Sequence, residues 1–165
     1  MQNNIENKKE VKPSAWFILI ILVLSIIGIT DSTYLTIKHY THSDINCSIL
    51  DGCNIVTTST YSTVFGMPVA LLGIIFYISI FILVFLLSNK GKKKLLKSLF
   101  VISTTGFLMS MWFVYAQAFI LNSYCLYCLI SAVLSTTIFI LSGIMMLKYK
   151  NIKEINKNTQ YETNN

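Results

Sequence analysis

The chain has 165 residues, of which 54% are apolar and 12% charged, and its formal net charge is +6. This composition excludes an ordinary soluble domain. Most of the chain is therefore expected to lie in lipid.

An α-helix needs about 20 apolar residues to cross a hydrocarbon core about 30 Å thick. Four runs in the sequence are that long, namely residues 16–37, 67–87, 95–121 and 126–147. Apolar and polar residues do not alternate in them, so they do not predict the strands of a closed barrel. We expect an all-α membrane protein, with a bundle of four transmembrane helices built from residues 14–149. A cleaved signal peptide is the alternative for the first run, but no small-residue cleavage site follows it.

The positive charge is concentrated in three places. Lysines precede the first run, fill the connection between the second and third runs, and follow the fourth: Lys8, Lys9, Lys12, Lys90, Lys92, Lys93, Lys94, Lys97, Lys148, Lys150, Lys153 and Lys157. The positive-inside rule places these segments, and so both termini, on the cytoplasmic side. The lysines are expected to contact lipid headgroups, and no nucleic-acid partner is needed to explain them.

The remaining segments are polar. Residues 1–13 are expected to form a cytoplasmic tail, and residues 150–165 a disordered cytoplasmic tail. Residues 38–66 form the longest connection, on the outer side, and are expected to fold back over the bundle as a cap.

One cysteine pair, Cys125 and Cys128, opens the fourth run at its outer end. The unpaired N–H groups and the dipole at a helix N-terminus stabilise a thiolate there, so this pair is predicted to be redox-active. Three residues of helix place Cys128 about 4.5 Å deeper than Cys125. One sulfur can then face the aqueous rim while the other faces an apolar cavity.

A second pair, Cys47 and Cys53, lies in the outer connection, where Asp51 and Gly52 favour a turn that brings the sulfurs together. Thiol exchange proceeds through mixed disulfides. An outer pair and a helix-anchored inner pair can therefore carry electrons from a soluble dithiol to an acceptor dissolved in the membrane.

Other interpretations stay open at this stage. The cysteines can form two structural disulfides in a tetraspan structural protein, or incidental disulfides in a small four-helix transporter. A four-thiolate zinc site is possible by count, but an oxidising exterior disfavours it, and no metal site is predicted. Asp31 near the outer end of the first helix has either a functional role or a contact with headgroups and hydroxyls.

The sequence resembles the vitamin K epoxide reductase family, in particular its bacterial homologues that couple disulfide formation to quinone reduction. The resemblance covers about residues 28–131 and rests on these motifs: Asp31-Ser-Thr-Tyr-Leu-Thr36, Cys47-x5-Cys53, Val56-x2-Ser59-x-Tyr61, Phe65-Gly-Met-Pro-Val-Ala-Leu-Leu-Gly73 and Cys125-x2-Cys128. It implies an enzyme of a bacterial plasma membrane with its cysteines on the outer side.

The resemblance also implies roles for the cysteines. Cys47 and Cys53 would oxidise a thioredoxin-like extracytoplasmic thiol protein, with Cys53 exchanging with Cys125. Cys128 would pass electrons to a quinone, either menaquinone or ubiquinone.

Ser59 matches a hydroxyl position in the loop that caps the quinone pocket of the family. Nearness to the outer mouth of the bundle adds Tyr61, Phe113 and Gln117 as candidate pocket residues.

Two positions depart from the eukaryotic members of that family. Val69 stands where they carry Asn, and Ala132 where they carry Tyr, both of which bind the vitamin K head group. Quinone reduction is therefore expected rather than epoxide reduction. Some bacterial members carry a fused thioredoxin-like domain, and here the redox partner is expected to act in trans.

Overall fold

The structure is a computed structural model that describes residues 15–41, 53–59, 62–64, 66–90 and 93–163. Its long elements are α1 (Ala15–Thr41), α3 (Val69–Lys90), α4 (Lys93–Tyr115) and α5 (Leu126–Thr163), with a π-helical turn η2 (Ala116–Ile120) continuing α4. Four helices are long and apolar enough to cross a membrane. The predicted all-α fold, a four-helix bundle, is confirmed.

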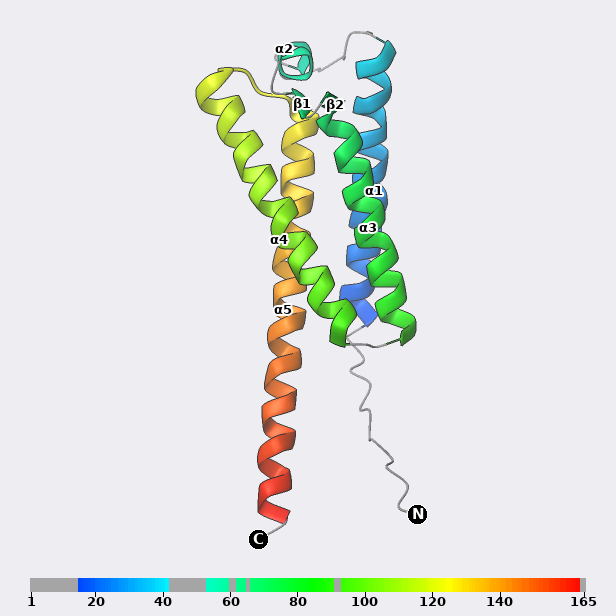
Figure 1. Cartoon of the computed structure of the whole chain (residues 1–165), viewed down its shortest axis with the longest axis vertical. Helices are drawn as coiled ribbons and strands as arrows, with labels where there is room; N and C mark the ends of the chain where they lie inside the picture. The colour runs from blue at the N-terminus through cyan, green and yellow to red at the C-terminus, as the bar shows by residue number, and fades with distance from the viewer. Residues whose placement is uncertain (1–14, 42–52, 60–61, 65, 91–92, 164–165) are drawn as a thin grey trace.

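The four helices pack in two pairs, as Figure 1 shows. Helix α1 lies against α3, and α4 lies against α5, while contacts of α1 with α5 and of α3 with α4 join the pairs. Toward η2, α4 leans away from α3, and residues 121–125 then lead back to the start of α5 (Figure 1). The end of α4 that continues into η2 is therefore farther from α3 than its start is.

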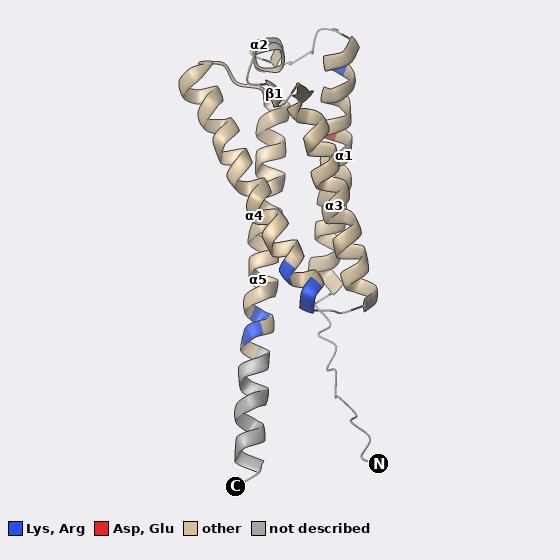
Figure 2. Cartoon of the chain, in the orientation of Figure 1, with Lys and Arg blue, Asp and Glu red and all other residues tan. Residues whose placement is uncertain are grey.

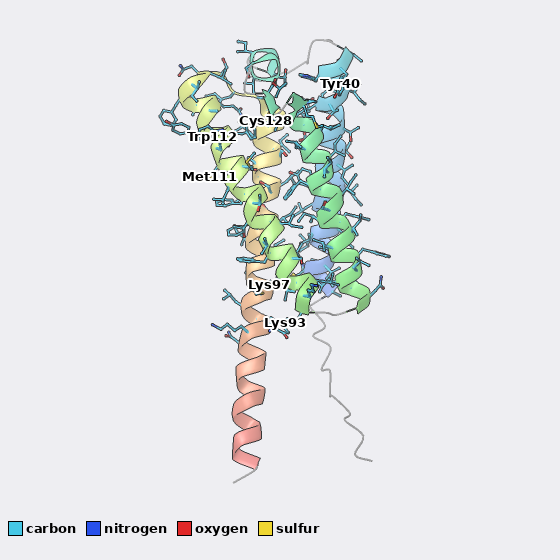
Figure 3. The ribbon with its side chains drawn as sticks, viewed as in Figure 1. Tyr40, Lys93, Lys97, Met111, Trp112 and Cys128 are labelled. Atoms are coloured by element: carbon cyan, nitrogen blue, oxygen red, sulfur yellow. The ribbon has the colours of Figure 1, made fainter. Side chains whose placement is uncertain are left out.

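The helices are apolar both inside and outside the bundle. On α1, Ile21 is fully buried whereas Leu19 and Val23 are exposed. On α4, Met111 and Trp112 are exposed and point away from the bundle, as Figure 3 shows. Such an outer surface suits lipid, because lipid tails are as apolar as a protein core.

A short cap covers one end of the bundle. It contains the helix α2 (Cys53–Thr58) and two antiparallel strands, β1 (Thr63–Val64) and β2 (Met67–Pro68). Gly66 between the strands has a positive φ of 78°, a backbone conformation that glycine adopts without a steric penalty. The cap lies where α5 begins (Figure 1), as expected for the outer connection. We call this end of the bundle the α2 end.

The helix bounds differ from the prediction at several ends. Helix α1 runs to Thr41, and α3 starts at Val69 because Met67 and Pro68 pair with β1. The third membrane helix ends in the π-helical turn.

The largest difference is that α5 continues to Thr163, so the prediction of a disordered tail from residue 150 was wrong for that stretch. The sequence has no Pro or Gly after Gly143. Extending an existing helix needs no new nucleation, and so α5 persists into the polar stretch.

Lysines on α4 and α5 lie away from the α2 end. Figure 2 shows the basic positions near the start of α4 and in the middle of α5, toward the opposite end of the bundle. Lys93 and Lys97 are labelled there in Figure 3. The charge is thus distributed unequally along the bundle axis.

Candidate active site

Cys125 is the N-cap residue of α5. Its carbonyl oxygen accepts the first hydrogen bond of the helix, from the N–H of Leu129 at 3.1 Å. Its sulfur accepts hydrogen bonds from the N–H groups of Tyr127 and Cys128, which are the second and third residues of the helix. The thiol therefore takes the place of the oxygen that usually caps a helix N-terminus.

The pKa of the Cys125 thiol lies below its ordinary value. The largest cause is a hydrogen bond with the side chain of Cys128, and the two backbone N–H groups lower the pKa further. Burial of the sulfur and the charge of Asp31 oppose the shift. A helix N-terminus was predicted to favour the thiolate, and Cys125 has this property.

Gln117 holds the N-cap residue from the neighbouring helix. Its Oε1 accepts the backbone N–H of Cys125 at 2.9 Å, and only 2% of Gln117 is exposed. The residue lies in η2, where the N–H of Leu121 bonds to the carbonyl of Ala116 at 2.9 Å. The π-helical turn η2 is thus the segment that carries the Gln117 amide.

Cys53 and Cys125 belong to one buried cluster at the α2 end. Cys53 begins α2, is 1% exposed, and packs in this cluster with Leu35, Val56 and Cys125. It is disulfide-bonded, whereas Cys125 and Cys128 are free thiols, so its bridge is to neither of them.

Cys125 itself has no exposed surface. The expectation that it faces the aqueous rim was therefore wrong, because α2 and its neighbours cover it.

Cys128 opens into a cavity of about 350 Å³ inside the bundle. Figure 3 shows this residue near the α2 end of α5. Most of the wall is apolar and comes from the cap and all four long helices: Leu35, Val56, Val69, Ala70, Leu72, Phe76, Met109, Phe113, Ala116, Leu121 and Ala132. The two sulfurs of the CxxC pair thus have different surroundings, one closed and one open to the cavity.

A few polar groups interrupt the apolar wall. The Tyr77 hydroxyl lies 2.8 Å from Ser131 Oγ and donates to the Ser131 carbonyl at 3.0 Å. Ser110 Oγ and Ser135 Oγ lie 2.6 Å apart, and both residues line the cavity. These bonds join α3 and α4 to α5 across the cavity.

The structure brings together most of the predicted site residues. Ser59, Phe113 and Gln117 line the same cavity as Cys128, and Ser59 Oγ donates to the Val56 carbonyl at 2.7 Å. Cys47 and Tyr61 lie outside the described residues.

Sequence reasoning missed the bonded pair of Tyr77 and Ser131, since nothing in their spacing signals a contact between α3 and α5. It left Asp31 undecided, and this residue also lines the cavity.

No three His, Cys, Asp or Glu side chains come close enough to hold a metal ion in the part of the chain that the structure describes. The four-thiolate zinc alternative includes Cys47, which lies outside that part.

Comparison with known proteins adds two matches. Residues 19–143 match the family described as "Vitamin K epoxide reductase family". Over 136 residues the chain is 35% identical to the thiol-disulfide oxidoreductase LTO1 of Arabidopsis thaliana, an alignment that covers 76% of this chain and 35% of that protein. The chain therefore spans about a third of the length of this relative.

Proposed function

The chain belongs to the vitamin K epoxide reductase family, and from this membership we propose that it is an integral membrane thiol oxidoreductase. It re-oxidises a thioredoxin-like dithiol protein outside the cytoplasm and passes two electrons to a membrane quinone. The net result is protein disulfide formation. The relative named as a thiol-disulfide oxidoreductase supports the thiol chemistry.

One observation carries the proposal: the two sulfurs of the inner pair have different neighbours. Cys125 packs in the same buried cluster as the disulfide-bonded Cys53, while Cys128 lines the cavity. A two-step transfer needs such an arrangement, because one sulfur must exchange with the outer pair and the other must face the acceptor. In the proposed reaction the Cys53 thiolate of the reduced outer pair attacks Cys125 of the inner disulfide, and Cys128 leaves as a thiolate.

The low pKa of Cys125 suits this exchange. Attack on a disulfide requires the thiolate form, and a thiol with a lowered pKa is also the better leaving group. Cys47 then attacks Cys53 in the Cys53–Cys125 bridge, which re-forms the outer disulfide, releases the Cys125 thiolate and completes the transfer of two electrons to the inner pair. The outer pair, Cys47 with Cys53, exchanges with the donor protein in the same way.

The cavity suits a quinone ring. The surface of its wall is mostly apolar, and polar side chains interrupt it at Asp31, Ser32, His39, Thr57, Ser59, Ser62, Tyr77, Thr105, Ser110, Gln117, Ser131 and Ser135. Ligand sites of this size usually combine apolar walls with a few placed polar groups. A bound quinone supplies the two-electron acceptor, and Phe113 and Ser59 lie where they would contact it.

Quinone reduction is favoured over epoxide reduction. Val69 and Ala132, the positions at which eukaryotic members carry Asn and Tyr, both line the cavity. Neither side chain has a polar atom with which to bond a head group. Menaquinone and ubiquinone are both compatible with this wall.

The lysines support an orientation in which the α2 end faces outward. Lys93, Lys94 and Lys97 are near the start of α4, and Lys148 and Lys150 are in the middle of α5. Both positions lie toward the end of the bundle opposite α2, which is the cytoplasmic side by the positive-inside rule. We place both termini in the cytoplasm, the cysteines on the outer side, and the protein in a bacterial plasma membrane.

The test is quinone reduction by the purified protein, supplied with a reduced thioredoxin-like donor, beside the four single Cys→Ala variants. Cys128→Ala should lose quinone reduction while a mixed disulfide between the donor and the outer pair still forms. Cys53→Ala and Cys125→Ala should lose quinone reduction, because electrons from the donor no longer reach the inner pair. Normal quinone turnover by Cys128→Ala would defeat the assignment.

A further inference from the structure

Asp31 carries a carboxyl group inside the membrane bundle. Hydroxyl groups on the same helix form hydrogen bonds with its backbone: Ser25 donates to the carbonyl of Ile21 at 2.7 Å, and Thr33 to that of Ile29 at 2.6 Å. Asp31 Oδ2, in contrast, is buried and has no hydrogen-bond partner among the described residues. A buried polar atom without a partner costs free energy, so it calls for a functional explanation.

This carboxyl faces the cavity into which Cys128 opens. Both residues line its wall, Asp31 from α1 and Cys128 from α5. Asp31 is also close enough to interact electrostatically with the thiols of Cys125 and Cys128. Asp31 therefore lines the space proposed for the quinone and is coupled electrostatically to the reactive sulfurs.

Asp31 and the inner thiols are coupled through charge. Two negative charges close together in a poorly solvated site repel strongly, so an ionised Asp31 disfavours a Cys125 thiolate. A proton on the carboxyl removes this repulsion. The protonation of Asp31 and the ionisation of the inner pair are thus linked.

We propose that Asp31 is the proton-transfer residue between the inner cysteine pair and the quinone. This inference rests on the proposed function. When Cys125 and Cys128 form a disulfide, the two thiols lose two electrons and two protons, and the quinone that accepts both electrons gains two protons at its oxygens. Asp31 takes one proton from the thiols and donates one to the nearer quinone oxygen, so it ends in its starting state. The second proton comes from water in the cavity, to which the other thiol proton is released.

The other titratable groups around Asp31 are less suited to this role. From α3, the Tyr77 hydroxyl is engaged with Ser131. From α5, Tyr127 lies against the Tyr34 ring, with centroids 5.0 Å apart.

On α1, His39 also lines the cavity, and the Lys38 ammonium lies 5.9 Å from the centre of the Tyr34 ring. The described cavity wall has no titratable side chain from α2 or α4. Asp31 is the group with a free, buried acceptor atom.

The first experiment measures quinone reduction by wild type, Asp31→Asn, Asp31→Glu and Glu154→Gln across a range of pH. Asn keeps the shape of the side chain and, like a protonated carboxyl, offers one acceptor oxygen and a donor, but it cannot transfer a proton. We expect Asp31→Asn to lower kcat roughly 100-fold, a typical contribution of general acid–base catalysis, with a far smaller change in KM for the quinone. Asp31→Glu should restore much of the rate. Glu154, on the extension of α5, serves as a control for loss of a carboxylate and should match wild type.

The second experiment needs no quinone. In a background with Cys47→Ala and Cys53→Ala, the ultraviolet absorbance of the thiolate is titrated with pH. Asp31→Asn should shift the Cys125 transition to lower pH, because the opposing negative charge is gone, whereas Glu154→Gln should not move it. Disulfide exchange between the outer pair and the donor is measured separately, in Asp31→Asn protein that keeps Cys47 and Cys53. Normal exchange in that protein shows that Asp31→Asn is folded.

The outcomes separate this inference from the proposed function. If wild type reduces quinone and Asp31→Asn does so equally fast at every pH, the proton-transfer role is overturned and the oxidoreductase function stands. An unchanged Cys125 titration in Asp31→Asn also overturns it, since no coupling would exist. If wild type reduces no quinone, the function and the role of Asp31 both fail.

Discussion

The amide oxygen of Gln117 accepts the backbone N–H of Cys125 at 2.9 Å, and this bond ties the last turn of the third membrane helix to the first thiol of the fourth. Both residues are buried, with exposed fractions of 2% and 0%. The position of the Cys125 sulfur therefore depends on a side chain eight residues earlier in the chain.

Replacing Gln117 with Leu should destabilise the protein and displace the thiol. The buried N–H of Cys125 would lose its partner, which costs about 1–3 kcal/mol. The measurement is the free energy of unfolding in detergent, combined with the rate of disulfide exchange at Cys125.

Ser123→Ala is the matched control for Gln117→Leu. Ser123 bonds to Gln117 through its backbone N–H, 3.2 Å from the Gln117 carbonyl, and this bond survives the substitution. Equal stability of Gln117→Leu and Ser123→Ala would show that the amide does not hold the N-cap.

The lowered pKa of Cys125 predicts a definite pH dependence. In the reduced protein the Cys125 thiolate should form at lower pH than an ordinary thiolate. Between the lowered pKa and the ordinary one, the unfolded chain holds a proton that the folded chain has released. The free energy of unfolding therefore increases with pH in that interval, and this gain is lost as pH falls through the lowered pKa. Thiolate absorbance and thermal unfolding at several pH values measure the two effects.

The side chain at position 128 should control this pKa. A bond with Cys128 is the largest cause of the shift, so Cys128→Ala should raise the pKa of Cys125 toward its ordinary value. Cys128→Ser keeps a hydrogen-bond donor and should retain much of the shift. The explanation fails if Ala and Ser at this position give the same titration curve.

Gly28→Ala should destabilise the bundle. A Cβ at this position would overlap the Tyr77 ring, which is 1% exposed and bonded to Ser131. Overpacking of this kind costs about 1–3 kcal/mol. Thermal unfolding in detergent measures the loss.

Gly143→Ala is the control for Gly28→Ala. Its Cβ would have the Phe100 ring at 3.6 Å, an ordinary contact, and Ala favours a helix over Gly by up to about 1 kcal/mol. It should be neutral or mildly stabilising. A larger loss at Gly143 than at Gly28 would contradict the packing of α1 against α3.

Filling the cavity should weaken quinone binding without affecting the outer pair. Ala132→Trp places a large ring in the cavity wall, and we expect the apparent affinity for quinone to fall about tenfold or more, equivalent to about 1.4 kcal/mol. Val133→Trp is the control, because Val133 is 66% exposed on the outer surface. Equal quinone affinity of the two variants would show that the cavity is not the binding site.

Much of the fold was predictable because each membrane helix needs a long apolar run. The four runs, the cap and the position of Cys125 at a helix start follow from chain length, hydropathy and spacing. Ser59, Phe113 and Gln117 were found from their nearness to the outer mouth or from the family resemblance, and all three line the cavity.

Helix rotation was not predictable, for a physical reason. On α1, Ile21 is buried and Leu19 is 56% exposed, although both are equally suited to core and lipid. A helix that is apolar all round does not specify which face turns inward. The contacts of Tyr77 with Ser131, and the inward position of Asp31, depend on that rotation.

The π-helical turn was also beyond sequence reasoning. Ala116–Ile120 reads as ordinary helix, and Gln117 was expected to contact quinone. Gln117 does line the cavity, and its Oε1 also accepts a backbone N–H, which only the register of the wider turn reveals.

The burial of Cys125 beneath α2 shields this thiol from small reductants in solution. A small thiol in solution finds no exposed sulfur surface at Cys125 to attack. In the proposed reaction electrons thus reach Cys125 through Cys53, and a small reductant in solution cannot bypass the donor protein at this sulfur. Selectivity for the donor at this step is then decided by the outer pair.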